Sequence, residues 1–179
     1  MSKLLYSVSM SLDGFIAGPG GDMSWLTPHL GPNPELDALQ RDIGALLVGH
    51  RTFQGDDPNR GTDKEGAFGG TWSGPIVVVT HHPPAEPVPG ITFSDSLLGG
   101  LATARAAAGD RYVNILGADI ARQCLAAGEL DEILTIIVPV FLGDGVRLFE
   151  HPGGRHVQLE RLSLVEGPRA TNLWMRVVR

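Results

Sequence analysis

Cysteine is almost missing from this sequence, because Cys124 is the only one among 179 residues. A single cysteine excludes a disulfide framework and a zinc site built from cysteines. The six histidines show no metal-ligand spacing either, so we expect no metal site. Cys124 falls within an apolar helical pattern, which is typical of a small buried hydrophobic residue.

Long apolar runs and basic runs are missing as well. No apolar stretch approaches the roughly 18 residues that a membrane-spanning helix needs. Polar Ser7, Ser9 and Ser11 interrupt the apolar residues that follow Lys3, so we expect no signal peptide. The 14 Lys and Arg residues against 20 Asp and Glu give a formal net charge of −6. Nucleic-acid binding relies on phosphate neutralisation, so we expect a soluble cytoplasmic protein without a nucleic-acid or membrane partner.

Several catalytic signatures are also missing. The sequence contains no GxxxxGK[ST] phosphate loop, no GxSxG nucleophile elbow and no HExxH zinc motif. The His-x-Glu and PCxxC pair of zinc deaminases is missing too. These absences remove the motif-based reasons for expecting a P-loop nucleotidase, an α/β-hydrolase, a zinc protease or a deaminase.

Glycine and proline, by contrast, are plentiful, with 24 and 13 residues. They indicate many turns between short elements. Apolar runs and alternation predict strands at 4–10, 45–48, 76–80, 112–116, 132–140, 157–165 and 171–178. Helical spacing predicts helices at 35–43, 97–107 and 120–127. The second helix is predicted to be capped by Ser94 or Asp95.

The alternation of strands and helices predicts the α/β fold class in one domain, residues 1–179. Strands connected through helices pair in parallel, whereas the two closing strands follow each other directly and should be antiparallel. We expect a mixed, mostly parallel sheet with helices on both faces. Segment 54–74 breaks the pattern, because it is rich in glycine and too long for an ordinary connection; such loops are either functional or disordered.

Three predicted strands end in residues suited to phosphate binding. Each leads into a glycine, a hydroxyl or a cation where a helix can begin, and free N–H groups at helix starts bind phosphates. The residues at these strand ends are Gly49, His50, Arg51, Thr52, Thr80, His81, Gly117, Ala118, Asp119 and Ile120. Carboxyl ends of neighbouring parallel strands form a ligand crevice. We therefore favour a nucleotide-type ligand over a purely architectural role.

A fourth motif, S-L-D-G-F-I-A at 11–17, is followed by G-D-M-S-W-L at 21–26. Further motifs follow in order: L-L-V-G-H-R-T-F at 46–53, V-V-V-T-H at 77–81, L-G-A-D-I at 116–120 and P-V-F-L-G-D-G-V-R-L-F at 139–149. Together they resemble the dihydrofolate-reductase-like superfamily. The resemblance is greatest to the C-terminal reductase domain of the bifunctional riboflavin-biosynthesis deaminase–reductase, in a stand-alone form, and covers nearly the whole chain.

The resemblance implies a dihydrofolate-reductase-like fold and an oxidoreductase that passes hydride from NADPH to a small heterocyclic substrate. By position, Ser9, Ile16 and Ala17 match backbone contacts to the nicotinamide carboxamide. Residues 49–52 match the segment that holds the 2′-phosphate and pyrophosphate, Thr80 and His81 lie beside the adenosine ribose, and 117–120 match the loop and helix at the pyrophosphate.

The resemblance bears on further positions. Trp25, Gly20 and Gly21 match the mobile lid over the nicotinamide. Arg51, or His50, is the kind of cation that distinguishes NADPH from NADH. The sequence departs from the family pattern at Leu116, where most relatives carry the first of two glycines, and this departure puts the cofactor pose in question.

The dihydrofolate enzymes use a carboxylate on their first helix, so Glu35 and Asp37 are candidate proton donors. Asp13, in the S-L-D-G-F-I-A motif, is the third catalytic candidate. For Glu35 and Asp37 the alternative is that acidic residues are simply favoured at a helix start by the helix dipole.

The main functional prediction is a monofunctional NADPH-dependent reductase resembling 5-amino-6-(5-phosphoribosylamino)uracil reductase. A dihydrofolate or pterin reductase, and a non-catalytic NADPH-binding module, are the alternatives.

The β-branched run 133–140 and the closing strands together carry more apolar residues than one sheet face needs, the closing-strand positions being Leu159, Leu162, Leu164, Leu173 and Val177. Together with the resemblance, this predicts a homodimer formed by the C-terminal strands. The alternative is a monomer in which the helices and segment 83–89 cover them.

Overall fold

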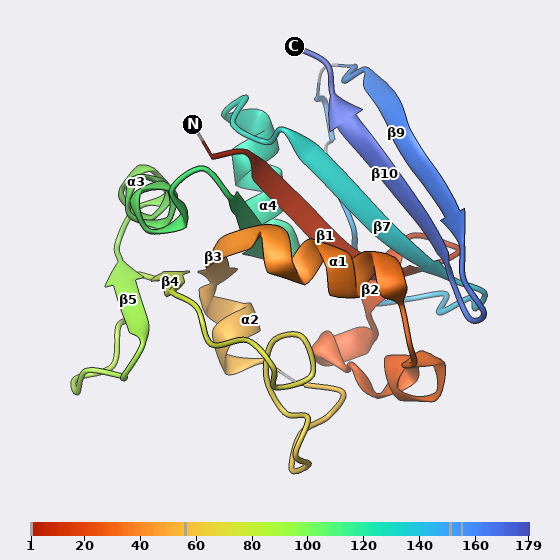
Figure 1. Ribbon diagram of the computed structural model, residues 1–179, viewed down its shortest axis with the longest axis horizontal. Coiled ribbons are helices and arrows are strands. Elements are labelled where there is room, and N and C mark those ends of the chain that lie inside the picture. The colour runs from red at the N-terminus through yellow and green to blue at the C-terminus, as the bar shows by residue number, and fades with distance from the viewer. Residues whose placement is uncertain (1, 56, 151, 155) are drawn as a thin grey trace.

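The computed structural model describes residues 2–55, 57–150, 152–154 and 156–179 (Figure 1). Its main sheet contains β1 (Leu4–Ser11), β3 (Ile43–Gly49), β4 (Ile76–Val79), β5 (Ile91–Ser94), β6 (Tyr112–Leu116), β7 (Glu132–Val138), β9 (Leu159–Glu166) and β10 (Thr171–Val177). A small second sheet pairs β2 (Phe15–Ala17) with β8 (Val146–Arg147). The helices are α1 (Pro34–Asp42), α2 (His50–Gln54), α3 (Leu97–Ala108) and α4 (Ala118–Ala126), with 3-10 turns η1 (Pro19–Gly21) and η2 (Ser24–His29).

The main sheet has eight strands in the order β5-β4-β3-β6-β1-β7-β10-β9. The first six of this order are parallel to their neighbours, while β10 runs antiparallel to β7 and β9 antiparallel to β10. The predicted mixed, mostly parallel α/β sheet with antiparallel closing strands is therefore confirmed.

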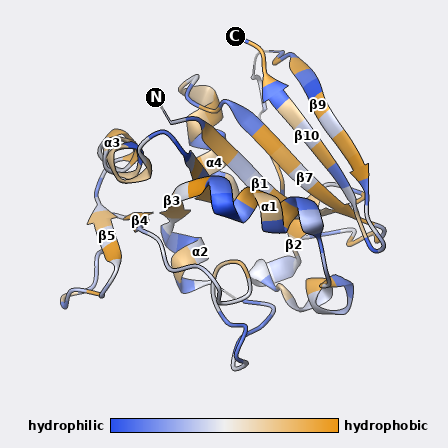
Figure 2. Ribbon diagram, viewed as in Figure 1, coloured by the Kyte–Doolittle hydropathy of each residue, from blue (hydrophilic) through white to orange (hydrophobic). Residues whose placement is uncertain are grey.

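Helices cover both faces of the sheet. On one face, α3 and α4 contribute Leu101, Ala104 and buried Cys124 to a core with Leu4 and Tyr6. On the other face, α1 packs through its buried Leu39 against sheet residues such as Leu46 and Leu134. Figure 1 shows α1 crossing the near face, with α4 behind the sheet. Figure 2 shows the apolar residues concentrated along the central strands.

Strand β1 is more deeply buried than its alternating sequence suggests. The two faces were expected to differ, yet Leu4, Leu5 and Tyr6 are all fully buried. The reason is its position between β6 and β7, with a helical layer on each face. Burial also raises the pKa of the Cys124 thiol to about 12, which fits the predicted role of a small buried hydrophobic residue.

Some predicted boundaries are wrong, each for a local reason. The cap of α3 is Ser96 rather than Ser94 or Asp95, and its hydroxyl accepts a hydrogen bond from Gly99 N at 3.3 Å. Strand β7 ends at Val138, short of the predicted residue 140, because Pro139 has no N–H for the ladder. Helix α1 ends at Asp42, since Ile43 is already extended, with φ −81° and ψ 131°.

The long segment 54–74 folds against α1, apart from residue 56, which lies outside the described residues. The Asp57 carboxylate accepts hydrogen bonds from Asn59 N and Gly66 N, both at 2.7 Å. Gln40 of α1 donates to the Thr71 hydroxyl at 2.9 Å. Within the described ranges, no helix is long and apolar enough to cross a membrane.

Candidate functional site

A cavity of about 400 Å³ lies at the carboxyl ends of β4, β3 and β6, where α2, α3 and α4 begin. All ten strand-end residues that the sequence singled out line it: Gly49, His50, Arg51, Thr52, Thr80, His81, Gly117, Ala118, Asp119 and Ile120. They meet because the three strands are neighbours in the sheet. The predicted crevice between parallel strand ends is therefore present.

The cavity also contains residues that the sequence analysis did not select: Val79, His82, Asp95, Ser96, Leu97 and Gln123. Three of them surround the start of α3, which reaches the cavity because β5 pairs beside β4. Strand β5 was not recognised, because it alternates apolar and polar residues over only four positions, whereas the equally short β4 is an uninterrupted run of β-branched residues. Gln123 lies one helical turn after Asp119, and this i, i+4 spacing is the signal that points to it.

Thr80 organises one wall of the cavity. Its buried hydroxyl lies 2.8 Å from Nδ1 of His50 and accepts a hydrogen bond from His82 N at 3.0 Å. A hydroxyl that accepts from His82 can still donate to Nδ1 of His50, which then leaves Nε2 of that ring as the N–H donor. The rings of His50 and His82 meet edge to face, with centroids 6.4 Å apart.

A close approach of two helix starts forms the floor. Gly117 has φ +111°, and a Cβ atom there would lie 2.4 Å from the Thr52 hydroxyl oxygen. The backbone conformation therefore favours glycine, and a larger residue would also displace the Thr52 hydroxyl. As the N-cap of α4, Gly117 supplies no side-chain hydrogen bond, so the first N–H groups of this helix have no side-chain acceptor at their cap.

The charged side chains around the cavity differ in whether they already form hydrogen bonds or ion pairs. The Asp119 carboxylate accepts hydrogen bonds from Arg122 at 2.7 Å and Gln123 at 2.8 Å. The Arg122 hydrogen bond lowers the pKa of Asp119, to which Arg51 adds a smaller attraction. Arg51 is exposed and forms no ion pair within the described part of the chain. Its guanidinium is thus available to an anionic ligand.

The residues predicted to contact nicotinamide do not line this cavity. Ser9 belongs to the last part of β1, which neighbours β6, whereas Ile16 and Ala17 belong to the short strand β2. The predicted lid follows directly: Gly20 and Gly21 lie in η1 and Trp25 in η2. These segments follow the carboxyl end of β1. The cavity lies at the carboxyl ends of β3, β4 and β6, so both lie at the same end of the parallel strands.

The three candidate carboxylates lie in three different environments. Asp13 accepts from the Ser11 hydroxyl at 2.6 Å, from Leu142 N at 3.1 Å and from Gly143 N at 2.7 Å. Glu35 accepts from the Ser163 hydroxyl at 3.1 Å through Oε1, while its Oε2 is buried without a partner in the described part of the chain. Asp37 lines a different cavity, beside the start of β3.

None of these three carboxylates lines the cavity at the strand ends. The Ser11 hydrogen bond, together with the two backbone donors, lowers the pKa of Asp13 to about 2. Asp13 therefore holds no proton near neutral pH, and its contacts join the end of β1 to the segment before β8. This arrangement favours a structural role for Asp13 over proton donation.

Comparison with solved structures identifies the fold. A riboflavin biosynthesis protein from Shewanella sp. PV-4 superposes with a TM-score of 0.76 at 20% identity, covering 99% of both chains. Dihydrofolate reductase from Enterococcus faecalis, complexed with NADP(H), gives 0.64 at 17% identity, covering 98% of this chain and 95% of that one.

A longer relative matches through part of its length. The diaminohydroxyphosphoribosylaminopyrimidine deaminase/5-amino-6-(5-phosphoribosylamino)uracil reductase of Thermotoga maritima gives a TM-score of 0.69 at 17% identity. The match covers 99% of this chain and 57% of the Thermotoga chain. No curated protein matches the chain in sequence. The model of the RibD C-terminal domain, however, matches residues 2–171, and the chain therefore belongs to the RibD C-terminal domain family.

Proposed function

We propose that the chain is an NADPH-dependent reductase that acts on a ribosylaminopyrimidine or a closely related heterocycle. The observation that carries this proposal is the cavity at the ends of β4, β3 and β6, with an available arginine and the uncapped start of α4. The family and the reductase named in the Thermotoga relative supply the reaction class.

The residues around the cavity fit a dinucleotide phosphate. Gly117 places no side chain of its own at the start of α4, so that backbone N–H groups of α4 can face a pyrophosphate. Arg51 would hold the 2′-phosphate, with Thr80 fixing the neighbouring His50 ring. NADPH supplies the hydride when bound, and the chain's own task is to orient the two rings and exclude water.

For the proton we propose Glu35, with Asp37 as the second candidate. Among the three carboxylates, Glu35 alone has an oxygen that is buried and without a hydrogen-bond partner in the described part of the chain. Its helix, α1, begins near the carboxyl end of β7, and Asn33 is its N-cap. Asn33 also exchanges two side-chain hydrogen bonds with Asn172 of β10, at 2.9 and 3.1 Å, which fixes the start of this helix.

The test is turnover by the full chain. We expect NADPH oxidation, followed by absorbance, when 5-amino-6-(5-phosphoribosylamino)uracil is added, and a Glu35→Gln variant should lose most of kcat while still binding NADPH. Turnover of dihydrofolate instead would favour a dihydrofolate reductase, as the Enterococcus likeness suggests. NADPH binding without turnover of either substrate would favour a non-catalytic binding module.

A further inference from the structure

A second cavity, of about 660 Å³, lies at the opposite end of the same strands. Its lining includes the first residues of β3, Ile43 and Gly44, and Arg111, which directly precedes β6. The cavity at the strand ends instead includes Gly49 and Gly117, at the other ends of β3 and β6. The second cavity lies within the roughly 300–1,000 Å³ typical of small-molecule sites. The two cavities share no lining residue.

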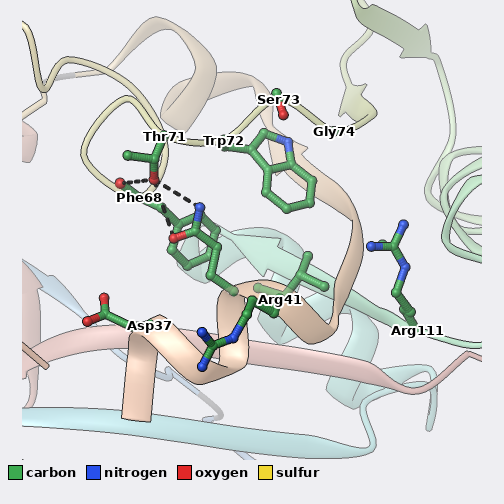
Figure 3. A pocket seen from close by; sticks show the side chains of 11 residues that line it. Asp37, Arg41, Phe68, Thr71, Trp72, Ser73, Gly74 and Arg111 are labelled. Atoms are coloured by element: carbon green, nitrogen blue, oxygen red, sulfur yellow. Dashed lines mark hydrogen bonds between the residues drawn. The ribbon is translucent and has the colours of Figure 1, made fainter. Parts of the chain in front are cut away.

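One wall of the second cavity is aromatic. Phe68 and Trp72, from the loop before β4, have ring centroids 6.0 Å apart and planes inclined by 44°. The loop is held to α1 because Gln40 donates to Thr71, whose hydroxyl donates to Phe68 O at 2.7 Å. Figure 3 shows these contacts and the indole of Trp72 at the edge of the opening.

The loop conformation around these rings is unusual. Phe68 has φ +55°, and within the described ranges no other residue except glycine has a positive φ. Such a conformation costs free energy and is concentrated at ligand sites. A Cβ atom at position 74 would lie 2.4 Å from the Trp72 ring, so Gly74 is needed for the indole to lie where it does. The indole Nε1 is buried and has no acceptor in the described part of the chain.

The charged residues at the second cavity favour an anion. Arg41 and Arg111 both line it, and neither forms an ion pair with a described residue. Asp37 is the one carboxylate in its lining. Figure 3 shows Arg111 extending from the start of β6 toward the side of the cavity that carries Trp72. In a chain of net charge −6, two guanidinium groups without ion pairs beside one cavity are a specific feature.

We propose that this cavity is a second ligand site, which binds a small aromatic or heteroaromatic compound carrying a phosphate or carboxylate group. The ring would lie against Phe68 and Trp72, and the anionic group would contact Arg111, with Arg41 contributing at the α1 side. The ligand is a small molecule other than the reductase substrate, because the cavity lies at the opposite end of β3 from the cavity at the strand ends, roughly 20 Å away for a strand of seven residues. The existence of the site does not depend on the reductase activity.

Binding of 1-naphthyl phosphate to the full chain, with 1-naphthol as the uncharged control, tests the site. We expect the phosphate to bind about tenfold more tightly than the alcohol, and Arg111→Gln to weaken it by about tenfold or more. Arg179→Gln is the matched control, because it removes the same charge at a surface ion pair with Asp131. Failure of the phosphate to bind, equal affinities for both probes, or equal losses in both variants would overturn the proposal.

The cavity at the strand ends could also attract a phosphate, so Arg51→Gln locates the probe. We expect 1-naphthyl phosphate affinity to be unchanged in Arg51→Gln and about tenfold weaker or more in Arg111→Gln. The reverse pattern would place the probe at Arg51 and overturn the second site. Quenching of intrinsic fluorescence by the probe should also disappear in Trp72→Phe, which keeps an aromatic wall.

Steady-state kinetics with the phosphorylated pyrimidine substrate provide a second test. Arg111→Gln should leave the substrate KM and the NADPH KM unchanged although it weakens 1-naphthyl phosphate binding, because the second cavity shares no residue with the cavity at the strand ends. A substrate KM raised by about tenfold would show that the cavity belongs to the substrate site and would overturn a separate ligand site. Absence of all turnover would count against the proposed reductase and leave the probe-binding tests decisive for the cavity.

Discussion

At the scale of single residues, the candidate cofactor site was largely predictable from where polar residues follow apolar runs. Gly49 ends β3 and Arg51 follows two residues later, while Thr80 and Gly117 come directly after β4 and β6. The carboxyl ends of neighbouring parallel strands lie together, which brings these residues into one cavity. Ser96 was missed because its approach to the cavity depends on the pairing of β5 with β4. The sequence could not rank the three candidate carboxylates, because partners that distinguish them come from distant segments: Ser163 for Glu35, and Leu142 and Gly143 for Asp13.

Arg51 gives the first residue-scale prediction. Arg51→Ala should weaken NADPH binding by roughly 1–3 kcal/mol, the value of a charge-assisted contact, and hardly change NADH binding, because only NADPH carries a 2′-phosphate. Titration of both cofactors by fluorescence measures this. Arg122→Ala is the control, since Arg122 lies close by but is bonded to Asp119. Equal losses of NADPH and NADH affinity in Arg51→Ala would refute the assignment.

Asp13 gives a prediction about pH. Its folded-state pKa of about 2 lies below its ordinary value of 3.8, with the Ser11 hydrogen bond as the largest cause. A group with a depressed folded pKa stabilises the fold above its unfolded pKa, and that contribution disappears as the pH falls through the folded value. We therefore expect Asp13→Asn to be less stable than the natural chain at pH 6, with the difference shrinking between about pH 4 and pH 2.

Urea unfolding of both proteins across that range provides the measurement for Asp13. Asp110→Asn, at an exposed position outside this hydrogen-bonded turn, is the matched control and should show no such convergence. A constant difference between Asp13→Asn and the natural chain at all pH values would show that the carboxylate charge does not stabilise the turn.

At the scale of elements, the strongly patterned strands and helices were predicted and the short ones were not. The β-branched run of β7 and the alternation of β10 are visible in the sequence because they extend over seven residues each. Strands β2 and β8 contain only three and two residues, which is less than one recognisable repeat. Their pairing arises from the chain reversal around Gly14 and from Asp13, so local patterning could not reveal it.

The caps of α1 and α3 allow a prediction about helices. Asn33 caps α1 and also bonds Asn172, which is only 2% exposed, whereas Ser96 caps α3 at an exposed position. Ser96→Ala should cost about 1 kcal/mol of unfolding free energy, the usual value of a lost cap. Asn33→Ala should cost about 2–4 kcal/mol, because it also leaves the buried Asn172 amide without its partner. Chemical denaturation measures the free energy of unfolding of both variants. Equal losses would mean that the hydrogen bonds between Asn33 and Asn172 contribute nothing to stability.

At the scale of the whole molecule, the two edges of the sheet differ in how they are used. The order β5-β4-β3-β6-β1-β7-β10-β9 places the cavity at the strand ends near one outer strand of the sheet, β5, and β9 at the opposite side. Segment 83–89 connects β4 and β5, so it lies at the edge opposite to β9. The alternative prediction was a monomer in which this segment helps to cover the apolar residues of the closing strands. In the described residues the segment does not lie beside those strands.

The exposed face and edge of β9 lead to the last prediction. Leu159, Leu162, Leu164 and Val165 are 41%, 37%, 57% and 42% exposed. Figure 2 shows apolar positions along this outermost strand. An exposed apolar edge strand is an association hazard that proteins manage by pairing or covering it. We propose that two copies pair through their C-terminal strands about a two-fold axis, which leaves both cofactor cavities open, because these lie toward the other edge.

Light scattering at micromolar concentration should then give about twice the chain mass of 19.0 kDa. Leu164→Glu should shift the protein to a monomer, since it places a charge in the apolar contact without touching the core. Leu98→Glu is the matched control: Leu98 is 70% exposed on α3, at a distance from β9 in the sheet order, and its substitution should leave the dimer intact. A mass near 19.0 kDa for the natural chain, or equal dissociation in both variants, would refute an interface at β9.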